Sequence, residues 1–392
     1  MSVGALPLAC GGENHPAEAR GDKNTVPESD GGGSDSGALI AEGHADACQK
    51  PINSGFAGDD LCIDPPAPDV GYQLHFGPSD YSDPAELAKY TLAPGVEEVK
   101  CVYLHTPNTE TKFYSEYHVR MRGGTHHMIL WAPTAATHDM VSPPPDGTLT
   151  DSCRNLDYTF ELGAQSGIGP QGASLDVPQP GKSQPKENEG LAYQDLPNTS
   201  VAMETHYINT GGDPILREVW INLIYEDPAT VKNKIDSVFW IGGLGMNVPP
   251  YSKQTITAGP AMPPTPPAGQ SIRILGLTGH VHAHTTHESV WLSHASGDKE
   301  LIYETYNWSD PLIASYDSAH VNPKPGLSSN SDGAPSGDLI LQAGDSVSWE
   351  CDVDNTTGAS LKFADLAYTA EMCNVFGFFA PGTGGEWASF NE

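Results

Sequence analysis

The sequence predicts an all-β protein built from two domains. Among its 392 residues are 42 glycines and 34 prolines, and turn clusters recur at short intervals. This composition fits many short strands joined by loops better than it fits long helices. Residues 112–119 alternate apolar and polar side chains, as a half-buried strand does. The length is sufficient for two domains, each with its own hydrophobic core.

The N-terminal region is expected to be a tether. Residues 11 to about 44 are rich in Gly, Ser, Asp and Glu and hold few large apolar side chains, so they cannot bury enough surface to become ordered. We therefore expect residues 1–44 to be disordered and ordered structure to begin near Cys48. A domain boundary is expected after Glu226-Asp227-Pro228, which gives a first domain at 45–229 and a second at 230–392.

Cys10 follows a short, mostly apolar segment near the N-terminus. The run Leu6-Pro7-Leu8-Ala9-Cys10 is similar to the tail of a bacterial lipoprotein signal, in which the cysteine is acylated. Neither a basic region nor a full apolar run precedes it. The other interpretation is an unpaired thiol in a flexible tail. No run reaches the roughly 18 apolar residues of a membrane-spanning helix, so no transmembrane segment is expected.

Further strands are expected along the rest of the chain. They are predicted near 201–207, 219–225, 272–284, 289–293, 346–351 and 367–379. Residues 141–200 are rich in Pro, Gly and Gln and are expected to form long surface loops.

Charge and cysteine content limit the class of protein. Lys and Arg total 19 and Asp and Glu total 50, and 19 − 50 = −31. Such a charge repels a phosphate backbone and an anionic membrane surface, so nucleic acid is excluded as a partner. It could attract cationic substrates, although an acidic surface more often serves solubility.

Seven cysteines, none in a C-x-x-C pair, argue against a zinc knuckle and predict three disulfides in an oxidising, extracytoplasmic compartment.

A first group of candidate metal ligands is formed by His126, His127 and His206. Neighbours on a regular strand face opposite sides, so His126 and His127 can share one metal only if the strand is twisted or bulged there. Gly123-Gly124 would permit such a bulge. His206 lies in a separate predicted strand and could supply a third imidazole. Each of these histidines taken alone is more commonly incidental or structural.

A second group is found at 277–287. His280, His282 and His284 are two residues apart, so on a strand all three rings project from one face. A pair of them is expected to bind metal, either His280 with His282 or His282 with His284. The next histidine, His287, precedes a Glu but lacks the second histidine of H-E-x-x-H, which excludes a zinc protease of that type.

Met372 is the candidate sulfur ligand. A methionine is ordinarily a core residue. Strand parity places Met372, Asn374 and Phe376 on one face and Cys373 on the other, where it could form a buried disulfide with Cys351. Three imidazoles in one group, and two imidazoles with a thioether in another, are suited to copper that cycles between Cu(I) and Cu(II).

Four motifs in order carry a resemblance to a known family. They are H-H-M at 126–128, H-Y at 206–207, H-x-H at 280–282 and E-M-C-N at 371–374. The series resembles the copper type II, ascorbate-dependent monooxygenases, which include peptidylglycine alpha-hydroxylating and dopamine beta-monooxygenases, and it covers roughly residues 55–385. The resemblance implies two antiparallel β-sandwiches of jelly-roll type packed side by side. Each would carry one copper on faces that look at each other across a solvent-filled cleft.

The resemblance also assigns roles to single residues. It implies that His126, His127 and His206 hold a copper that stores and passes an electron. It implies that His280, His282 and Met372 hold the copper at which dioxygen binds and a substrate C–H bond is hydroxylated. Two copper ions per chain, ascorbate as the reductant and a small-molecule or peptide substrate are implied with it. So are the disulfides Cys101–Cys153 and Cys351–Cys373, which leave Cys48 with Cys62.

Departures from the family pattern limit the substrate. Peptide-amidating members carry a Tyr four positions after the Met and an Arg two positions before the H-x-H, where this chain has Phe376 and Thr278. Asn374 matches the pattern. With Phe378, Phe376 forms an aromatic face that favours an apolar or aromatic substrate, and the negative charge of the chain favours an amine.

Two other functions fit the sequence. One is a copper-binding or storage protein of the same fold without turnover, and the other is a structural cell-surface sandwich with incidental histidines.

Overall fold

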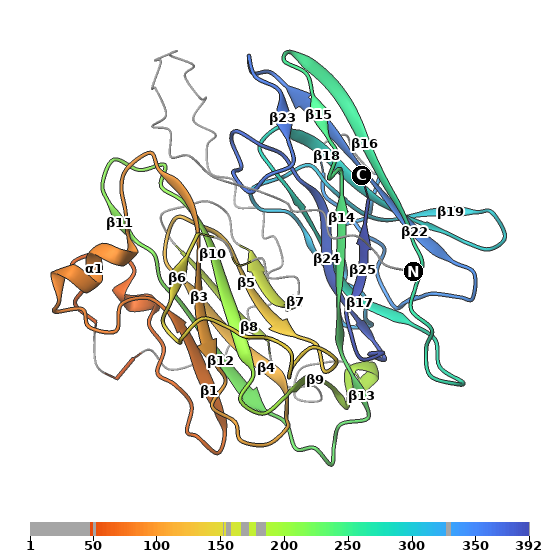
Figure 1. The fold of residues 1–392 in the computed structure, drawn as a ribbon. Coiled ribbons are helices and arrows are strands. Elements are labelled where there is room, and N and C mark those ends of the chain that lie inside the picture. Colours follow the sequence, from red (N-terminus) through yellow and green to blue (C-terminus); the bar gives the residue numbers. More distant parts are fainter. Residues whose placement is uncertain are drawn as a thin grey trace. The chain divides into compact units, whose positions relative to one another are not determined.

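The computed structural model describes residues 48–49, 52–151, 153, 158–165, 172–177, 186–326 and 331–391. Strands form nearly all of the regular structure in this part of the chain (Figure 1). The predicted all-β class is thereby confirmed. The expected tether at 1–44, with Cys10, lies outside the described residues.

The first half of the chain forms a sandwich of two sheets. One sheet contains, in spatial order, β1 (Gly71–Phe76), β12 (Val219–Tyr225), β4 (Lys112–Met121), β9 (Leu191–Asp195) and β13 (Asn233–Lys234), with β8 (Ala173–Val177) also beside β4. The other contains β6 (Leu149–Thr150), β3 (Glu97–His105), β10 (Ser200–Ile208), β5 (Thr125–Pro133) and β7 (Tyr158–Gln165). We call this unit the first sandwich.

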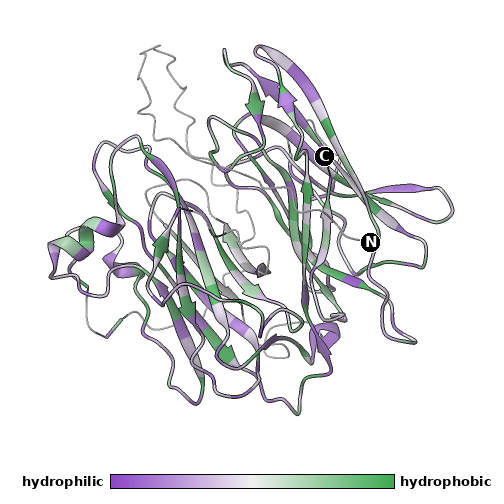
Figure 2. Ribbon diagram, in the orientation of Figure 1, coloured by the Kyte–Doolittle hydropathy of each residue, from purple (hydrophilic) through white to green (hydrophobic). Residues whose placement is uncertain are grey.

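The core of the first sandwich lies between its two sheets. Leu74 and Ile221 from one sheet belong to the same buried cluster as Val102 and Met203 from the other. Burying one such side chain contributes about 1.5–3 kcal/mol. The alternation of apolar and polar residues along the strands, visible in Figure 2, is what sends one face of each sheet into this core.

Short elements complete the first sandwich. Helix α1 (Pro84–Tyr90) begins with a proline, and the side chain of Asp83 caps it by accepting a hydrogen bond from Ala85 N at 2.8 Å. The remaining short elements are β2 (Thr91–Leu92) paired with β11 (Ile215–Leu216), and the 3-10 turns η1 (Asp59–Leu61) and η2 (Lys186–Asn188).

The second half forms a second sandwich. One sheet contains β20 (Ile313–Ser315), β17 (Arg273–Val281), β24 (Cys373–Ala380), β14 (Asp236–Gly242) and β25 (Trp387–Phe390), with β21 (Leu339–Ile340) also beside β17. The other contains β16 (Ser252–Ala261), β22 (Ser346–Asn355), β18 (Thr285–Ser293) and β19 (Lys299–Thr305), and β15 (Asn247–Val248) pairs with β23 (Leu361–Lys362) outside both.

The core of the second sandwich is centred on two indoles. Trp240 and Trp349, one from each sheet, stack with ring centroids 5.7 Å apart, and both are fully buried. The indole N–H of Trp349 donates to the carbonyl of Cys373 at 2.8 Å, so its polar atom is satisfied inside the core. This hydrogen bond anchors Cys373, the first residue of β24, which directly follows Met372.

Some sequence expectations differ from the structure. The region 141–200, expected to be loops, contains β6, β7, β8 and β9. These strands have eight residues or fewer, and the Pro- and Gly-rich turns between them dominate the local composition. The expected strand at 367–379 begins only at Cys373. Strand β13 still pairs with β9 and β14 begins at Asp236, so the sheets change a few residues after the expected boundary at 229.

Aromatic side chains join the two sandwiches, which lie in the same compact unit. Phe160 of β7 stacks on Phe376 of β24, with centroids 5.1 Å apart and planes 10° apart. Phe239 of β14 stacks on the same Phe376 at 5.4 Å. These rings share a buried cluster with Trp131 and Tyr158 of the first sandwich. Phe376 is therefore packed into an aromatic contact between sandwiches.

The described residues contain three disulfides, and they are the three expected pairs: Cys48–Cys62, Cys101–Cys153 and Cys351–Cys373. Cys351 lies on β22 and Cys373 on β24, so the last bond links the two facing sheets of the second sandwich. Among the described residues, no helix combines the length and apolar character needed to cross a membrane.

Removing the Cys351–Cys373 bond tests its contribution to the second sandwich. The double variant Cys351→Ala/Cys373→Ala should lower the free energy of unfolding by about 3 kcal/mol, because the bond closes a loop of 22 residues in the unfolded chain. Urea denaturation followed by tryptophan fluorescence measures the loss. A variant as stable as the unmodified protein would contradict this expectation.

Candidate metal centre

A β-bulge brings His126 and His127 to one place. In the ladder between β10 and β5, His206 pairs with His127 and Tyr207 pairs with Thr125, so His126 is the extra residue. Gly124, two residues before His126, has φ 88°, a conformation that glycine adopts readily. The sequence predicted that these neighbours could share a metal only if the strand is twisted or bulged there, and the register shows a bulge.

Three imidazoles converge at this bulge. Atoms of His126, His127 and His206 that could ligate a metal all lie within 4.8 Å of one another. The three residues are between 0% and 5% exposed. Both ring nitrogens of His126 and Nδ1 of His127 are buried without a hydrogen-bond partner. Since a buried polar atom without a partner is unfavourable, the group is better explained as a set of ligands than as core packing.

Burial also sets the protonation state of these rings. It lowers the pKa of His126 well below the usual 6.5, and the neighbouring His206 and His280 lower it further. Burial lowers the pKa of His127 in the same way, with His280 and His206 adding to the effect. Both imidazoles are therefore neutral at neutral pH, which is the form that binds metals.

Glu97 orients the third histidine. Its Oε1 lies 2.8 Å from Nε2 of His206, which leaves Nδ1 of that ring facing His127 Nε2 at 3.3 Å. A carboxylate on the far nitrogen of a metal-binding histidine fixes its tautomer and raises its basicity. Glu97 could not be identified from the sequence, because its place in an acidic pair at 97–98 offers no signal of this role.

The second group is built where β17 meets β24. His280 pairs with Asn374 and Val281 with Cys373 at the end of this antiparallel ladder. His282 follows the last residue of β17 and is fully buried, with no hydrogen-bond partner on either ring nitrogen. Burial lowers its pKa well below 6.5, and His206 and His126 lower it further. The rings of His280 and His282 lie 5.7 Å apart.

His284 lies apart from this group. The strand ends at Val281 and a turn follows, so the two-residue alternation assumed from the sequence does not reach His284. Its ring Nε2 donates to the carbonyl of Tyr368 at 3.0 Å. Of the two pairs left open by the sequence, the geometry favours His280 with His282.

Met372 lies directly before β24, on the same face as Asn374. Continuing the register from His280 opposite Asn374 puts residue 372 opposite His282. The side-chain amide of Asn374 donates to the sulfur of Met372 at 3.3 Å, and Met372 is 5% exposed. The thioether is therefore located at the edge of the strand pair that carries the second histidine group.

Glu371 ties the second group together. Its carboxylate accepts hydrogen bonds from the backbone N–H groups of His282 at 2.5 Å, Met372 at 2.9 Å and His284 at 3.2 Å. Burial raises the pKa of Glu371 to about 7, and the bonds from Met372 and His282 act in the opposite direction. This residue belongs to the E-M-C-N motif, but its positioning role was not foreseen.

The two histidine groups are in direct contact. The ring of His280 lies 4.8 Å from that of His127 and 5.9 Å from that of His126, and His206 lies 6.4 Å from His282. All five rings are buried. The solvent-filled cleft implied by the family resemblance is therefore wrong for this structure. The Phe160–Phe376 stack and a hydrogen bond from Ala367 to Glu97 hold the sandwiches together here.

Side chains of the second sandwich also contact the first group. The indole of Trp308 packs edge-on against His126, with centroids 5.7 Å apart, and Tyr368 packs against Trp308 at 5.6 Å. Phe376, expected near a substrate, lies 5.1 Å from His280. Imidazole nitrogens and a thioether sulfur in one buried region are donors that could hold a metal ion.

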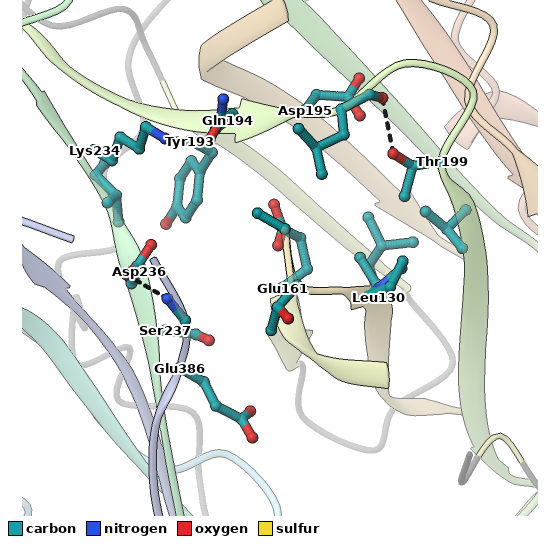
Figure 3. Close-up of a pocket in the computed structure, with 18 of the residues that line it drawn as sticks. Leu130, Glu161, Tyr193, Gln194, Asp195, Thr199, Lys234, Asp236, Ser237 and Glu386 are labelled. Carbon is teal, nitrogen blue, oxygen red and sulfur yellow. Dashed lines mark hydrogen bonds between the residues drawn. The ribbon is translucent and has the colours of Figure 1, made fainter. Parts of the chain in front are cut away.

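A separate pocket lies between β7 and β14 and has a volume of about 100 Å³. Figure 3 shows Glu161 projecting into it between Asp195 on one side and Asp236 on the other. Tyr114 donates to Glu161 at 2.9 Å. Burial raises the pKa of Glu161, Asp195 and Glu386 to about 7 each. These carboxyl groups hold their protons up to near-neutral pH.

Replacing Glu161 tests this pocket. Its folded-state pKa of about 7 lies above the usual 4.5, so its contribution to stability is complete below 4.5 and is lost as pH rises through 7. Glu161→Gln should therefore raise the free energy of unfolding by about 2 kcal/mol at about pH 8 and have little effect at about pH 4. Denaturant titrations at both pH values measure the difference.

The exposed Glu110 provides the control, because a Gln at that position removes no buried charge. Glu110→Gln should show no gain in stability between the two pH values. An equal effect of both substitutions would contradict the assignment of a buried, late-ionising carboxyl to Glu161.

No protein-family model and no curated protein matches this chain. Among solved structures it is similar, at 11% sequence identity, to a structure of PNGF-II, over 81% of this chain and 64% of that one, with a TM-score of 0.28. This chain thus spans about 64% of the length of that structure. A likeness at this TM-score supports no conclusion about function.

Proposed function

We propose that this protein is a copper-dependent monooxygenase that hydroxylates a substrate C–H bond with dioxygen and a one-electron reductant of the ascorbate type. One observation carries the proposal: three buried imidazoles converge with unpartnered nitrogens, and a second histidine pair with a neighbouring thioether lies against them. The residues that converge are those of the four motifs on which the family resemblance rests, and this supports the proposal.

The donor set favours copper over zinc. Structural and catalytic zinc is held by thiolate, imidazole and carboxylate, whereas a thioether is a soft ligand that favours Cu(I). The residues for the first ion are His126, His127 and His206. Those for the second are His280, His282 and Met372. Bound copper would supply the one-electron chemistry and the activation of dioxygen.

Other residues of the chain position the candidate ligands and determine the environment of the site. Glu97 holds one ring nitrogen of His206, so that the other faces the ligand cluster. Glu371 holds the turn of His282 next to Met372 through two backbone hydrogen bonds. Burial keeps the imidazoles of His126, His127 and His282 neutral and excludes water from the site. The contact between the groups gives electrons a short path from one to the other.

The proposed substrate is apolar or aromatic, and an amine in view of the charge of −31. Phe376 and Thr278 occupy the positions where peptide-amidating members grip a carboxylate, and neither can form an ion pair. Phe376 is covered by Phe160 in this structure, so a substrate beside His280 requires Phe160 to move. Turnover of a glycine-extended peptide, with none of aromatic amines, would overturn this choice.

A copper-binding or storage protein without turnover is the second candidate. The observation that favours it is the burial of the five histidines of the two groups, which are between 0% and 5% exposed. Reductant-dependent oxygen consumption separates the two functions. Consumption coupled to hydroxylation supports the enzyme, and its absence across a broad substrate panel supports the storage protein.

The disulfides indicate a compartment outside the cytoplasm. We propose that the protein is periplasmic, secreted, or attached to the outer membrane through a lipid on Cys10. Mass spectrometry of the N-terminal peptide from native membranes would detect that lipid.

Copper stoichiometry tests the ligand assignment. The protein should retain two equivalents of copper after chelator-free dialysis, and His206→Ala should retain one, because the first group loses an imidazole and its link to Glu97. Elemental analysis measures both. His105→Ala, which changes a partly exposed histidine elsewhere, should retain two. Equal copper in the His206 and His105 variants would contradict the assignment.

Replacing Met372 should reduce oxygen consumption more than it reduces stability. Met372→Leu keeps the side-chain volume, so stability should fall by less than about 1.5 kcal/mol. Oxygen consumption by the copper-loaded, reduced protein should fall by at least about tenfold, since even residues behind the ligands typically contribute that much. Met246→Leu, a buried methionine of the same sandwich, is the matched control and should leave consumption unchanged.

A further inference from the structure

Glu97 connects the two sandwiches at the histidine cluster. It is the first residue of β3, and its Oε1 accepts two hydrogen bonds. One comes from Nε2 of His206 at 2.8 Å, within the first sandwich. The other comes from the backbone N–H of Ala367 at 2.5 Å, in the second sandwich and 270 residues away in sequence. One carboxylate oxygen therefore contacts a ligand of the first group and the backbone of the other sandwich.

Ala367 leads directly to the second histidine group. Its carbonyl accepts a hydrogen bond from Ala283 N at 3.1 Å, and Ala283 lies between His282 and His284. The same segment continues to Glu371, which binds the backbone of His282 and Met372. A continuous series of hydrogen bonds thus runs from His206, through Glu97 and Ala367, to the turn that carries His282.

We propose that Glu97 is a positioning residue for both histidine groups: it orients the ring of His206 and fastens the His282 turn against the first sandwich. The inference rests on the proposed function for its role in copper chemistry. The hydrogen bonds from Glu97 to His206 and Ala367 are present in the metal-free protein, so the proposal is tested on that form.

The physical basis is the strength and burial of these bonds. Hydrogen bonds to a carboxylate are roughly twice as strong as those between neutral groups. Ala367 is fully buried and Glu97 is only 13% exposed in its side chain, so water replaces neither partner easily. Loss of the carboxylate leaves the N–H of Ala367 buried without its acceptor, which favours local opening of this segment.

Such an opening has a defined consequence for the proposed enzyme. The contact of His206 with His282 and of His127 with His280 requires the turn at 282–284 to stay against the first sandwich. Glu97 therefore controls the distance between the two ligand sets. That distance determines the length of the electron path between them.

Hydrogen exchange of the metal-free protein tests the link. In Glu97→Leu, which keeps the side-chain bulk and removes the acceptor, peptides covering 364–371 and 282–285 should exchange about tenfold faster than in the unmodified protein. Glu97→Gln retains an oxygen that can accept both bonds and should restore most of the protection. Glu116→Ala, which removes a similar carboxylate partner from His118 at 3.0 Å on β4, should leave both peptides unchanged.

The copper-loaded protein provides a second readout. The Cu(II) electron paramagnetic resonance signal of the three-histidine site should change in Glu97→Leu and not in Glu116→Ala, because only the first removes the partner of a ligand. Unchanged exchange of 364–371 in Glu97→Leu would overturn the proposal. A uniform increase in all peptides would also overturn it, since Glu97 would then act only on global stability. Failure of the unmodified protein to bind copper would reject the proposed function alone, because the exchange result stands without metal.

Discussion

The arrangement of the site depends on the burial of five imidazoles in mutual contact. A buried, neutral imidazole needs partners for its ring nitrogens, and His126 and His282 have none on either nitrogen. Three features position these histidines: the bulge in β5, the carboxylate of Glu97 and the carboxylate of Glu371. Without a ligand such as a metal ion, this part of the core would be unfavourable for stability.

Each sandwich contributes to the environment of the other's ligands. The first sandwich provides the acceptor for Ala367, and the second provides Trp308 against His126. The aromatic stack of Phe160, Phe376 and Phe239 extends the contact away from the histidines. The ligand groups therefore belong to the interface as much as to either core, and a change in the packing of the sandwiches changes the site.

Features determined by local pattern could be predicted from the sequence. The strand character of residues 219–225, which are mostly apolar, predicted β12 with its observed bounds. The need for a bulge at His126 followed from strand parity and the preceding glycines. Parity also placed Met372 and Asn374 on one face and Cys373 on the other, as their contacts now show.

Features determined by long-range packing could not be predicted. Glu97 acquires its role only through Ala367, 270 residues away, and nothing in the residues around 97 indicates that contact. Phe160 lies in a stretch whose composition suggested loops, and its stacking on Phe376 depends on how two separate sheets pack. The contact of the two histidine groups, where the family resemblance implied a gap, depends on the same packing. The change of direction after Val281 removed His284 from the ligand face, although its spacing in the sequence equals that of His280 and His282.

The position of Cys373 has a consequence for the effect of reduction. It lies between Met372 and Asn374 and is bonded to Cys351 on the opposite sheet, so the disulfide ties the strand next to the candidate sulfur donor to the facing sheet. Reduction would remove this restraint one residue away from Met372. The stability of this part of the second sandwich therefore depends on the redox state of the surroundings.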